Sequence, residues 1–277
     1  MPPVTLNSMG SLPSPPPVRF ARPSLTAEPP AALLSFENVS KRYPDGGREI
    51  VALAGVSFEL AAGAALGVHG ERCSGKSTLL RLAAAIEPPD GGSIRFAGQD
   101  ITRLSASERA QLLRGGVTLL AGADWLTCPG EIVLEHVAMS LGCEGLTIRE
   151  AKRRALATLD AVGVSAVGAA QSTASLSAEQ RARVMLARAL VGEPRLLLVD
   201  EPAPMPSLED HERFCATLRR VTRERGIALL VASEDMRTVG GLGPPMSLSV
   251  GGELLFNGDD HGMIVQGPWR AAASGPA

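Results

Sequence analysis

The sequence predicts a mixed α/β fold, and three observations support this prediction. A short apolar run at 64–68 leads into the glycine-rich stretch 70–78, and strong helix formers follow it at 79–85. A second apolar run, 196–199, ends directly in two carboxylates, at the edge where open α/β sheets bind ligands. Between these two features, 122–175 has helical patterns and no clear strand. We therefore expect an α/β core that carries an inserted helical subdomain over about 122–175.

The glycine-rich stretch carries the most specific local motif. Gly70-Glu71-Arg72-Cys73-Ser74-Gly75-Lys76-Ser77-Thr78 fits G-x-x-x-x-G-K-[ST], the phosphate-binding P-loop, and it lies between a strand and a helix as that motif requires. The backbone N–H groups of such a loop point at phosphate oxygens. Lys76 is placed to reach the β- and γ-phosphates, and the Ser77 hydroxyl to bind Mg²⁺. The alternative is a glycine-rich turn that matches by chance.

The N-terminal 32 residues are expected to form a disordered extension. They hold nine of the 21 prolines and few large apolar residues, a composition that favours polyproline II and builds no core. The extension is either an inert tail or a docking segment for a partner. Order is expected over 33–260, and the small and polar residues of 261–277 are expected to fray.

The elements before the helical block are expected to include a small antiparallel β subdomain. Alternating residues predict a first strand at 34–39, and Lys41–Gly47 is expected to form a turn. Further strands are expected at 50–53, 56–60, 93–97 and 117–121, and a helix at 105–113 with Ser105 as its cap.

The second half alternates helices and strands. Helices are expected at 131–141 and 147–162, the latter opened by a capping box of Thr147 and Glu150. The remaining expected elements are a helix from 176 to about 191, a strand at 195–200, a helix at 209–225, a strand at 227–232 and a hairpin of 246–250 with 253–256.

The carboxylate pair that follows the apolar run complements the P-loop. An Asp at the carboxyl end of such a strand holds Mg²⁺ opposite the P-loop hydroxyl, which makes Asp200 the second metal residue. A neighbouring Glu can polarise water for attack on the γ-phosphate, so Glu201 is the candidate general base. The alternative is a solvated strand end with two ordinary surface acids.

Together, these stretches resemble the ATP-binding subunit of ABC transporters, a P-loop NTPase fold. The resemblance runs from about 33 to 256 and rests on Lys41-Arg42-Tyr43, the P-loop, Leu176-Ser177-x-x-Gln180 with its helix, and Leu198-Val199-Asp200-Glu201-Pro202. Leu134-Glu135-His136-Val137 is similar to a segment of the branch that serves lipoprotein release, macrolide export and cell division.

The resemblance implies a partnership and a mechanism. Two such subunits would bind two ATP molecules between them, with each P-loop facing the other subunit's Ser177 and Gln180. Tyr43, the only tyrosine in the chain, matches the aromatic residue that stacks on adenine. Closure and reopening of the dimer would drive an integral membrane permease, which would hold the subunit at the cytoplasmic face of the membrane.

Several positions depart from the family's pattern. Ala178 and Glu179 replace the two signature glycines, and Glu179 is expected to bring negative charge near an anion site. Asp124 is the only polar side chain where a glutamine is expected, and Ser233-Glu234-Asp235 stands where the family has its switch histidine. In the P-loop, Arg72 is either a phosphate contact or a solvated side chain, and Cys73 is either a redox-active thiol or a tolerated small residue.

Composition narrows the function classes. A net charge of −2 and aromatic content of 3% argue against a nucleic-acid surface, and so against a DNA-acting ATPase. The four cysteines have no metal-ligand spacing, which suits a reducing compartment, and no apolar run reaches the ~20 residues of a membrane span. The sequence favours a transport-coupled ATPase of reduced turnover. The alternative is an assembly module that closes on ATP with little hydrolysis.

Overall fold

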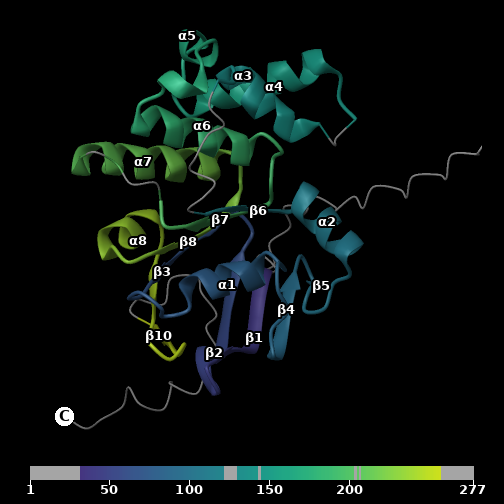
Figure 1. Ribbon diagram of the computed structural model, residues 1–277, viewed down its shortest axis with the longest axis vertical. Coiled ribbons are helices and arrows are strands. Elements are labelled where there is room, and N and C mark those ends of the chain that lie inside the picture. Colours follow the sequence, from purple (N-terminus) through teal and green to yellow (C-terminus); the bar gives the residue numbers. More distant parts are fainter. Residues whose placement is uncertain (1–31, 122–129, 143–144, 203–204, 206, 257–277) are drawn as a thin grey trace, which may run out of the picture.

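Two β-sheets organise the chain in the computed structural model, which describes residues 32–121, 130–142, 145–202, 205 and 207–256 (Figure 1). The smaller sheet is antiparallel, with strand order β2-β1-β4-β5. Its strands are β1 (Ala32–Asp45), β2 (Arg48–Ala61), β4 (Gly91–Phe96) and β5 (Gln99–Asp100).

The larger sheet has the order β10-β9-β3-β8-β7-β6, and all neighbours are parallel except the terminal hairpin of β9 and β10. Because the parallel strands point the same way, the chain segments that leave their carboxyl ends gather at one edge of the sheet. Its strands are β3 (Ala65–His69), β6 (Val117–Leu120), β7 (Leu196–Asp200), β8 (Ala228–Ser233), β9 (Pro245–Leu248) and β10 (Leu254–Phe256).

The larger sheet separates two hydrophobic cores. Along β7, Leu197 and Val199 pack into one core, and Leu196 and Leu198 into the other. A strand buried on both faces reads as a continuous apolar run, which is the pattern that 196–199 shows in the sequence. Between the two sheets lies α1 (Lys76–Ala83), whereas α6 (Ala178–Leu190), α7 (Leu208–Glu224) and α8 (Met236–Leu242) cover the opposite face (Figure 1).

Short helices occupy much of 130–175, farthest from the small sheet (Figure 1). They are α3 (Val133–Ala138), η2 (Met139–Leu141), α4 (Ile148–Ala161), α5 (Ala166–Ala169) and η3 (Thr173–Ser175). The predicted capping box of Thr147 and Glu150 is present at α4, and Ser105 caps α2 (Ala106–Gly115) as expected. None of the described helices has the length and apolar character of a membrane span.

The structure corrects several element boundaries. The predicted turn at Lys41–Gly47 is wrong, because β1 continues to Asp45 and pairs there with Arg48 of β2. The two strands expected at 50–53 and 56–60 form one strand, β2, and the register against β1 shifts near Val39 and Lys41. The predicted hairpin at 246–256 is confirmed, with Gly251 and Gly252 at positive φ in its turn. The predicted extension over 1–32 and tail over 261–277 lie outside the described residues, apart from Ala32.

Candidate functional site

The P-loop joins β3 to α1 and depends on close backbone approaches at two glycines. Gly75 adopts φ +98°, and a Cβ placed on it would lie 2.1 Å from the carbonyl oxygen of Ala52. A Cβ on Gly70 would lie 2.4 Å from Ser74 Oγ and 2.7 Å from the carbonyl oxygen of Leu248. Only glycine fits both places without displacing backbone. The spacing of the motif is therefore imposed by β2 and β9, which pack against the loop.

The amide groups that open α1 face the loop without a side-chain cap. Gly75 is the N-cap, and no side chain accepts a hydrogen bond from the first turn. An α-helix leaves its first N–H groups without intrahelical partners, and its macrodipole makes this end attractive to anions. The loop residues Glu71, Arg72 and Cys73 are exposed, Ser77 is half-buried, and Ser74 and Thr78 are buried.

Lys76 lies folded against the loop that it follows. Its Nζ donates to the carbonyl oxygens of Gly70 (2.7 Å) and Glu71 (2.9 Å), and its side chain is 7% exposed. A lysine held this way has its charge fixed over the loop, where phosphate oxygens would meet it.

The carboxylate pair lies at the same edge of the sheet, two strands away from β3. Asp200 ends β7, and its Oδ1 is buried without a hydrogen-bond partner among the described residues. Such an orphaned carboxylate oxygen is costly unless a ligand satisfies it. Within the described part of the chain, no group of three or more His, Cys, Asp or Glu side chains forms a metal cluster of its own.

Glu201 follows the strand at φ +53° and is clamped by the turn after β8. Its Oε2 accepts from the Ser233 hydroxyl (2.9 Å) and its Oε1 from the backbone N–H of Glu234 (2.8 Å). The left-handed backbone turns this carboxylate out of the strand direction, and two donors fix its orientation. The sequence gives no signal for the contact of Ser233 with Glu201, because the two residues lie 32 positions apart.

The altered switch segment also reaches the P-loop. Glu234 Oε1 lies 3.9 Å from Lys76 Nζ and 3.8 Å from Arg72 Nε. The acidic side chain that stands in the segment of the switch histidine is thus directed at the P-loop lysine. Arg72, left open between phosphate contact and solvent, is highly exposed and pairs loosely with this acid.

Tyr43 is anchored through its hydroxyl. It donates to Glu87 Oε1 (2.7 Å) and accepts from Arg81 Nη2 (3.2 Å), and Arg81 belongs to α1. Hydrogen bonding to Glu87 raises the pKa of the Arg81 guanidinium, although burial opposes the shift. The half-buried ring is therefore fixed beside the P-loop helix. Arg81 and Glu87 were not anticipated, because they lie 38 and 44 positions from Tyr43 and only tertiary packing brings them to it.

The segment Leu176-Ser177-x-x-Gln180 opens α6, apart from the P-loop in this chain. Ser177 Oγ accepts from Gln180 N (3.2 Å), and Gln180 Oε1 accepts from Ser177 N (2.9 Å), which forms a capping box. Both side chains are exposed. None of the hydrogen bonds or ion pairs among the described residues joins them to the P-loop.

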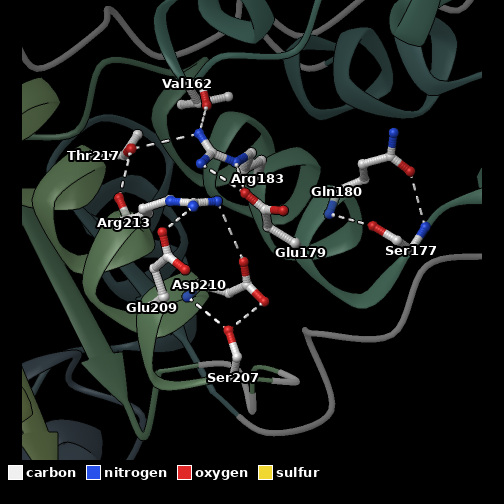
Figure 2. Close-up of polar contacts among 10 residues, drawn as sticks. All are labelled: Val162, Ser177, Glu179, Gln180, Arg183, Ser207, Glu209, Asp210, Arg213 and Thr217. Atoms are coloured by element: carbon white, nitrogen blue, oxygen red, sulfur yellow. Dashed lines mark hydrogen bonds and ion pairs between the residues drawn. The ribbon is translucent and has the colours of Figure 1, made fainter.

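Glu179 turns away from this helix end. Figure 2 shows its carboxylate directed toward Arg183, with Ser177 and Gln180 on the other side. Glu179 Oε1 accepts from Arg183 Nη2 (2.9 Å) and Nε (3.2 Å), and Arg183 Nη1 donates to the carbonyl oxygen of Val162 (2.7 Å). The expected negative charge at the anion site is thus compensated by an arginine one helical turn later. Asp124 lies outside the described residues.

Comparison with known proteins identifies the family. The family model described as "ABC transporter" matches residues 53–204, more than half of the 277-residue chain. The chain belongs to the ABC transporter family. The match spans the P-loop, the capped end of α6 and the carboxylate pair, so it includes all the site segments described above except Tyr43 and the switch turn.

One relative of this ABC transporter family member is a curated ATP-binding protein. The chain is 34% identical over 207 residues to the methionine import ATP-binding protein MetN of Caulobacter vibrioides. The aligned segment covers 75% of this chain and 61% of that protein. The chain thus spans about three fifths of this relative's length.

Solved structures confirm the predicted fold class. The ATP-binding cassette MJ0796, solved as a dimer in a post-hydrolysis state with ADP and Pi, matches with a TM-score of 0.71 and 25% identity, over 80% of this chain and 96% of that chain. The cbiO1 protein of Clostridium perfringens, part of the ABC transporter complex cbiONQ, has a TM-score of 0.74 and 24% identity, over 82% and 88% of the two chains, and shows the fold alone.

Proposed function

We propose that this chain is the ATP-binding and ATP-hydrolysing subunit of an ABC transporter, with reduced turnover. The observation that carries the proposal is the meeting of the P-loop lysine, Asp200 and Glu201 at one edge of the larger sheet. Glu234 links Lys76 to Glu201, since its amide holds Glu201 and its carboxylate faces Lys76. An edge that combines a cationic cradle with two acids suits phosphoryl transfer to water.

The loop and α1 would bind the nucleotide phosphates. Gly70 and Gly75 permit the close backbone approach, the first turn of α1 offers its N–H groups, and Lys76 supplies the fixed positive charge. The Tyr43 ring, fixed by Glu87 and Arg81, would stack on the adenine. These contacts would hold the β–γ bond of ATP at the carboxyl edge of the sheet.

The acids at this edge fit a magnesium site and a general base. Asp200 Oδ1 is buried without a hydrogen-bond partner in the described part of the chain, and the half-buried Ser77 hydroxyl stands at the start of α1, so these two side chains would hold Mg²⁺. Bound Mg²⁺ would neutralise charge on the phosphate oxygens. Glu201, oriented by Ser233 and Glu234, would accept a proton from the attacking water.

A second ATP-binding subunit would complete the site. Ser177 and Gln180 are exposed at the start of α6, and among the described residues they make no hydrogen bond to the P-loop of their own chain. In a dimer they would face the γ-phosphate bound by the partner's P-loop, and the relative MJ0796 is a dimeric cassette. We further propose that the dimer docks on an integral membrane permease, which would place it at the cytoplasmic face of the membrane.

The second candidate function is a nucleotide-dependent assembly module that hydrolyses little. The contact of the Glu234 carboxylate with Lys76 favours it, because negative charge at this point opposes the developing charge of the transition state. The retained and oriented Glu201 favours the ATPase.

Steady-state ATPase activity with Mg²⁺, measured beside Glu201→Gln, tests the choice. The amide keeps the size of the side chain but accepts no proton, so we expect turnover to fall at least ~100-fold. Tight Mg-ATP binding with equal, negligible turnover in both proteins would favour the assembly module. Absence of nucleotide binding in the folded wild-type chain would refute both functions.

A further inference from the structure

The switch turn brings a carboxylate to the position beside Lys76 that a terminal phosphate would take. Within the described ranges, Glu234 is the one acid with an oxygen within 4.0 Å of Lys76 Nζ, at 3.9 Å. Arg72 Nε lies 3.8 Å from the same oxygen. Thus the two cationic groups of the loop share one internal anion.

Hydrogen bonds hold the backbone on both sides of Glu234, so its side chain starts from a fixed position beside the P-loop. Its N–H donates to Glu201 Oε1 (2.8 Å), and the flanking Ser233 hydroxyl donates to Glu201 Oε2 (2.9 Å) while accepting from the N–H of Asp235 (3.1 Å). Asp235 then caps α8. The backbone from Ser233 to Asp235, which joins β8 to α8, is therefore held by hydrogen bonds, whereas the Glu234 side chain is 49% exposed.

We propose that Glu234 is a specificity-determining residue that makes the chain prefer nucleoside diphosphates to nucleoside triphosphates. The inference rests on the proposed function, because it concerns the same P-loop. The loop amides hold the α- and β-phosphates of either nucleotide, whereas Lys76 also reaches the γ-phosphate. A γ-phosphate must therefore repel the Glu234 carboxylate or displace it from Lys76 and Arg72. A diphosphate leaves the carboxylate in place.

The size of the preference follows from charge and exposure. Two like charges about 4 Å apart in a half-exposed site change affinity by about fivefold to tenfold. Because Glu234 remains near solvent, salt screens the interaction, and the preference should narrow as ionic strength rises from about 0.05 to 0.5 M. A steric effect of the side chain would not respond to salt.

Isothermal titration of the full chain with ADP and with a triphosphate analogue that resists hydrolysis, at fixed Mg²⁺, tests the proposal. In Glu234→Gln we expect the ratio of the analogue Kd to the ADP Kd to fall about fivefold to tenfold, with the ADP Kd changed less than about twofold. The matched control is Glu224→Gln, which removes the same charge at the far end of α7, where Glu224 pairs only with Arg220 among the described residues. Its ratio should equal that of the wild type.

The possible results distinguish a failure of the proposed role of Glu234 from a failure of the proposed function. A Glu234→Gln ratio within about twofold of wild type, with intact ADP binding, overturns the role of Glu234 and leaves the proposed function standing. A rise in the ratio also overturns it, because Glu234 would then assist the Mg-bound triphosphate. If the wild-type chain binds neither nucleotide although its far-UV circular dichroism is that of a folded protein, the proposed function is refuted, and the role of Glu234 is refuted as well.

Discussion

Replacing Arg183 tests whether the charge introduced at the start of α6 is compensated. The guanidinium makes two kinds of contact, hydrogen bonds to the Val162 carbonyl oxygen at the end of α4 (2.7 Å) and, more weakly, to Thr217 Oγ1 (3.5 Å), and a fork onto Glu179 Oε1 (2.9 and 3.2 Å). The Arg183 and Glu179 side chains are 16% and 31% exposed. Bonds from a charged donor in such partly buried sites contribute about 1.5 kcal/mol to the carbonyl and about 1 kcal/mol to the carboxylate.

Arg183→Met keeps the aliphatic length and removes both contacts, so we expect the free energy of unfolding to fall by about 2.5 kcal/mol. Glu179→Gln should cost about 1 kcal/mol, and the double variant about 2.5 kcal/mol rather than the additive value of about 3.5 kcal/mol. Urea unfolding followed by far-UV circular dichroism measures the three differences. Arg188→Met is the matched control, because Arg188 is exposed on the same helix and bonds only Ser140 among the described residues.

Two results would refute this reasoning. A loss below about 0.5 kcal/mol in Arg183→Met would mean that neither contact forms in solution. Additivity within about 0.3 kcal/mol would mean that Glu179 is not paired with Arg183, and its carboxylate would then be available to repel phosphate at the start of α6.

Two further predictions concern the P-loop glycine and the cysteines. Gly75→Ala should abolish nucleotide binding and lower the free energy of unfolding by at least about 2 kcal/mol. The backbone here has φ +98°, and the added Cβ would lie 2.1 Å from the Ala52 carbonyl oxygen. A normal nucleotide Kd in this variant would contradict the loop geometry. Burial, assisted by the negative charges of Asp235 and Glu212, raises the pKa of the Cys215 thiol to about 11. The stability that comes from keeping this thiol neutral in the folded state is therefore lost as pH rises from the ordinary thiol value of 9.0 to about 11. Peptide mapping after iodoacetamide treatment at pH 8 should therefore show exposed Cys73 modified at least ~100-fold faster than Cys215, and equal rates would exclude the burial.

Local chemistry made a large part of the fold predictable. The strand, loop and helix of the P-loop, the caps at Ser105 and Thr147, and the hairpin at Gly251-Gly252 all depend on residues within a few positions of one another. By contrast, α8 was not predicted, because it is short and contains Gly240 and Gly241. The extension of β1 to Asp45 was also missed, since pairing with β2 overrides the turn-like composition of Lys41–Gly47.

Within the candidate site, motifs placed the residues but not their partners. The P-loop motif and the apolar strand before the carboxylate pair were enough to predict Lys76, Asp200 and Glu201 as candidate site residues, and their roles stay predictions. The Ser233 bond to Glu201, the Arg183 fork on Glu179 and the anchoring of Tyr43 by Glu87 join residues between 4 and 44 positions apart. Of these, only the Glu179–Arg183 spacing is a signal that the sequence itself offers, as an i,i+4 pair. The other contacts arise from tertiary packing.

Glu179 and Glu234 are both acidic replacements in family motifs, but their contacts give them different consequences. Glu179 is paired with Arg183 and turned from Ser177, so its charge does not oppose a phosphate that meets the Ser177 hydroxyl at the start of α6 (Figure 2). Glu234 faces Lys76, so its charge acts where this chain's own P-loop would bind ATP. In a heterodimer with an unaltered subunit, we accordingly expect impairment at the site built on this chain's P-loop. The site formed by this chain's Ser177 and the partner's P-loop should work nearly normally, because the Glu179 carboxylate near a phosphate bound there is neutralised by Arg183.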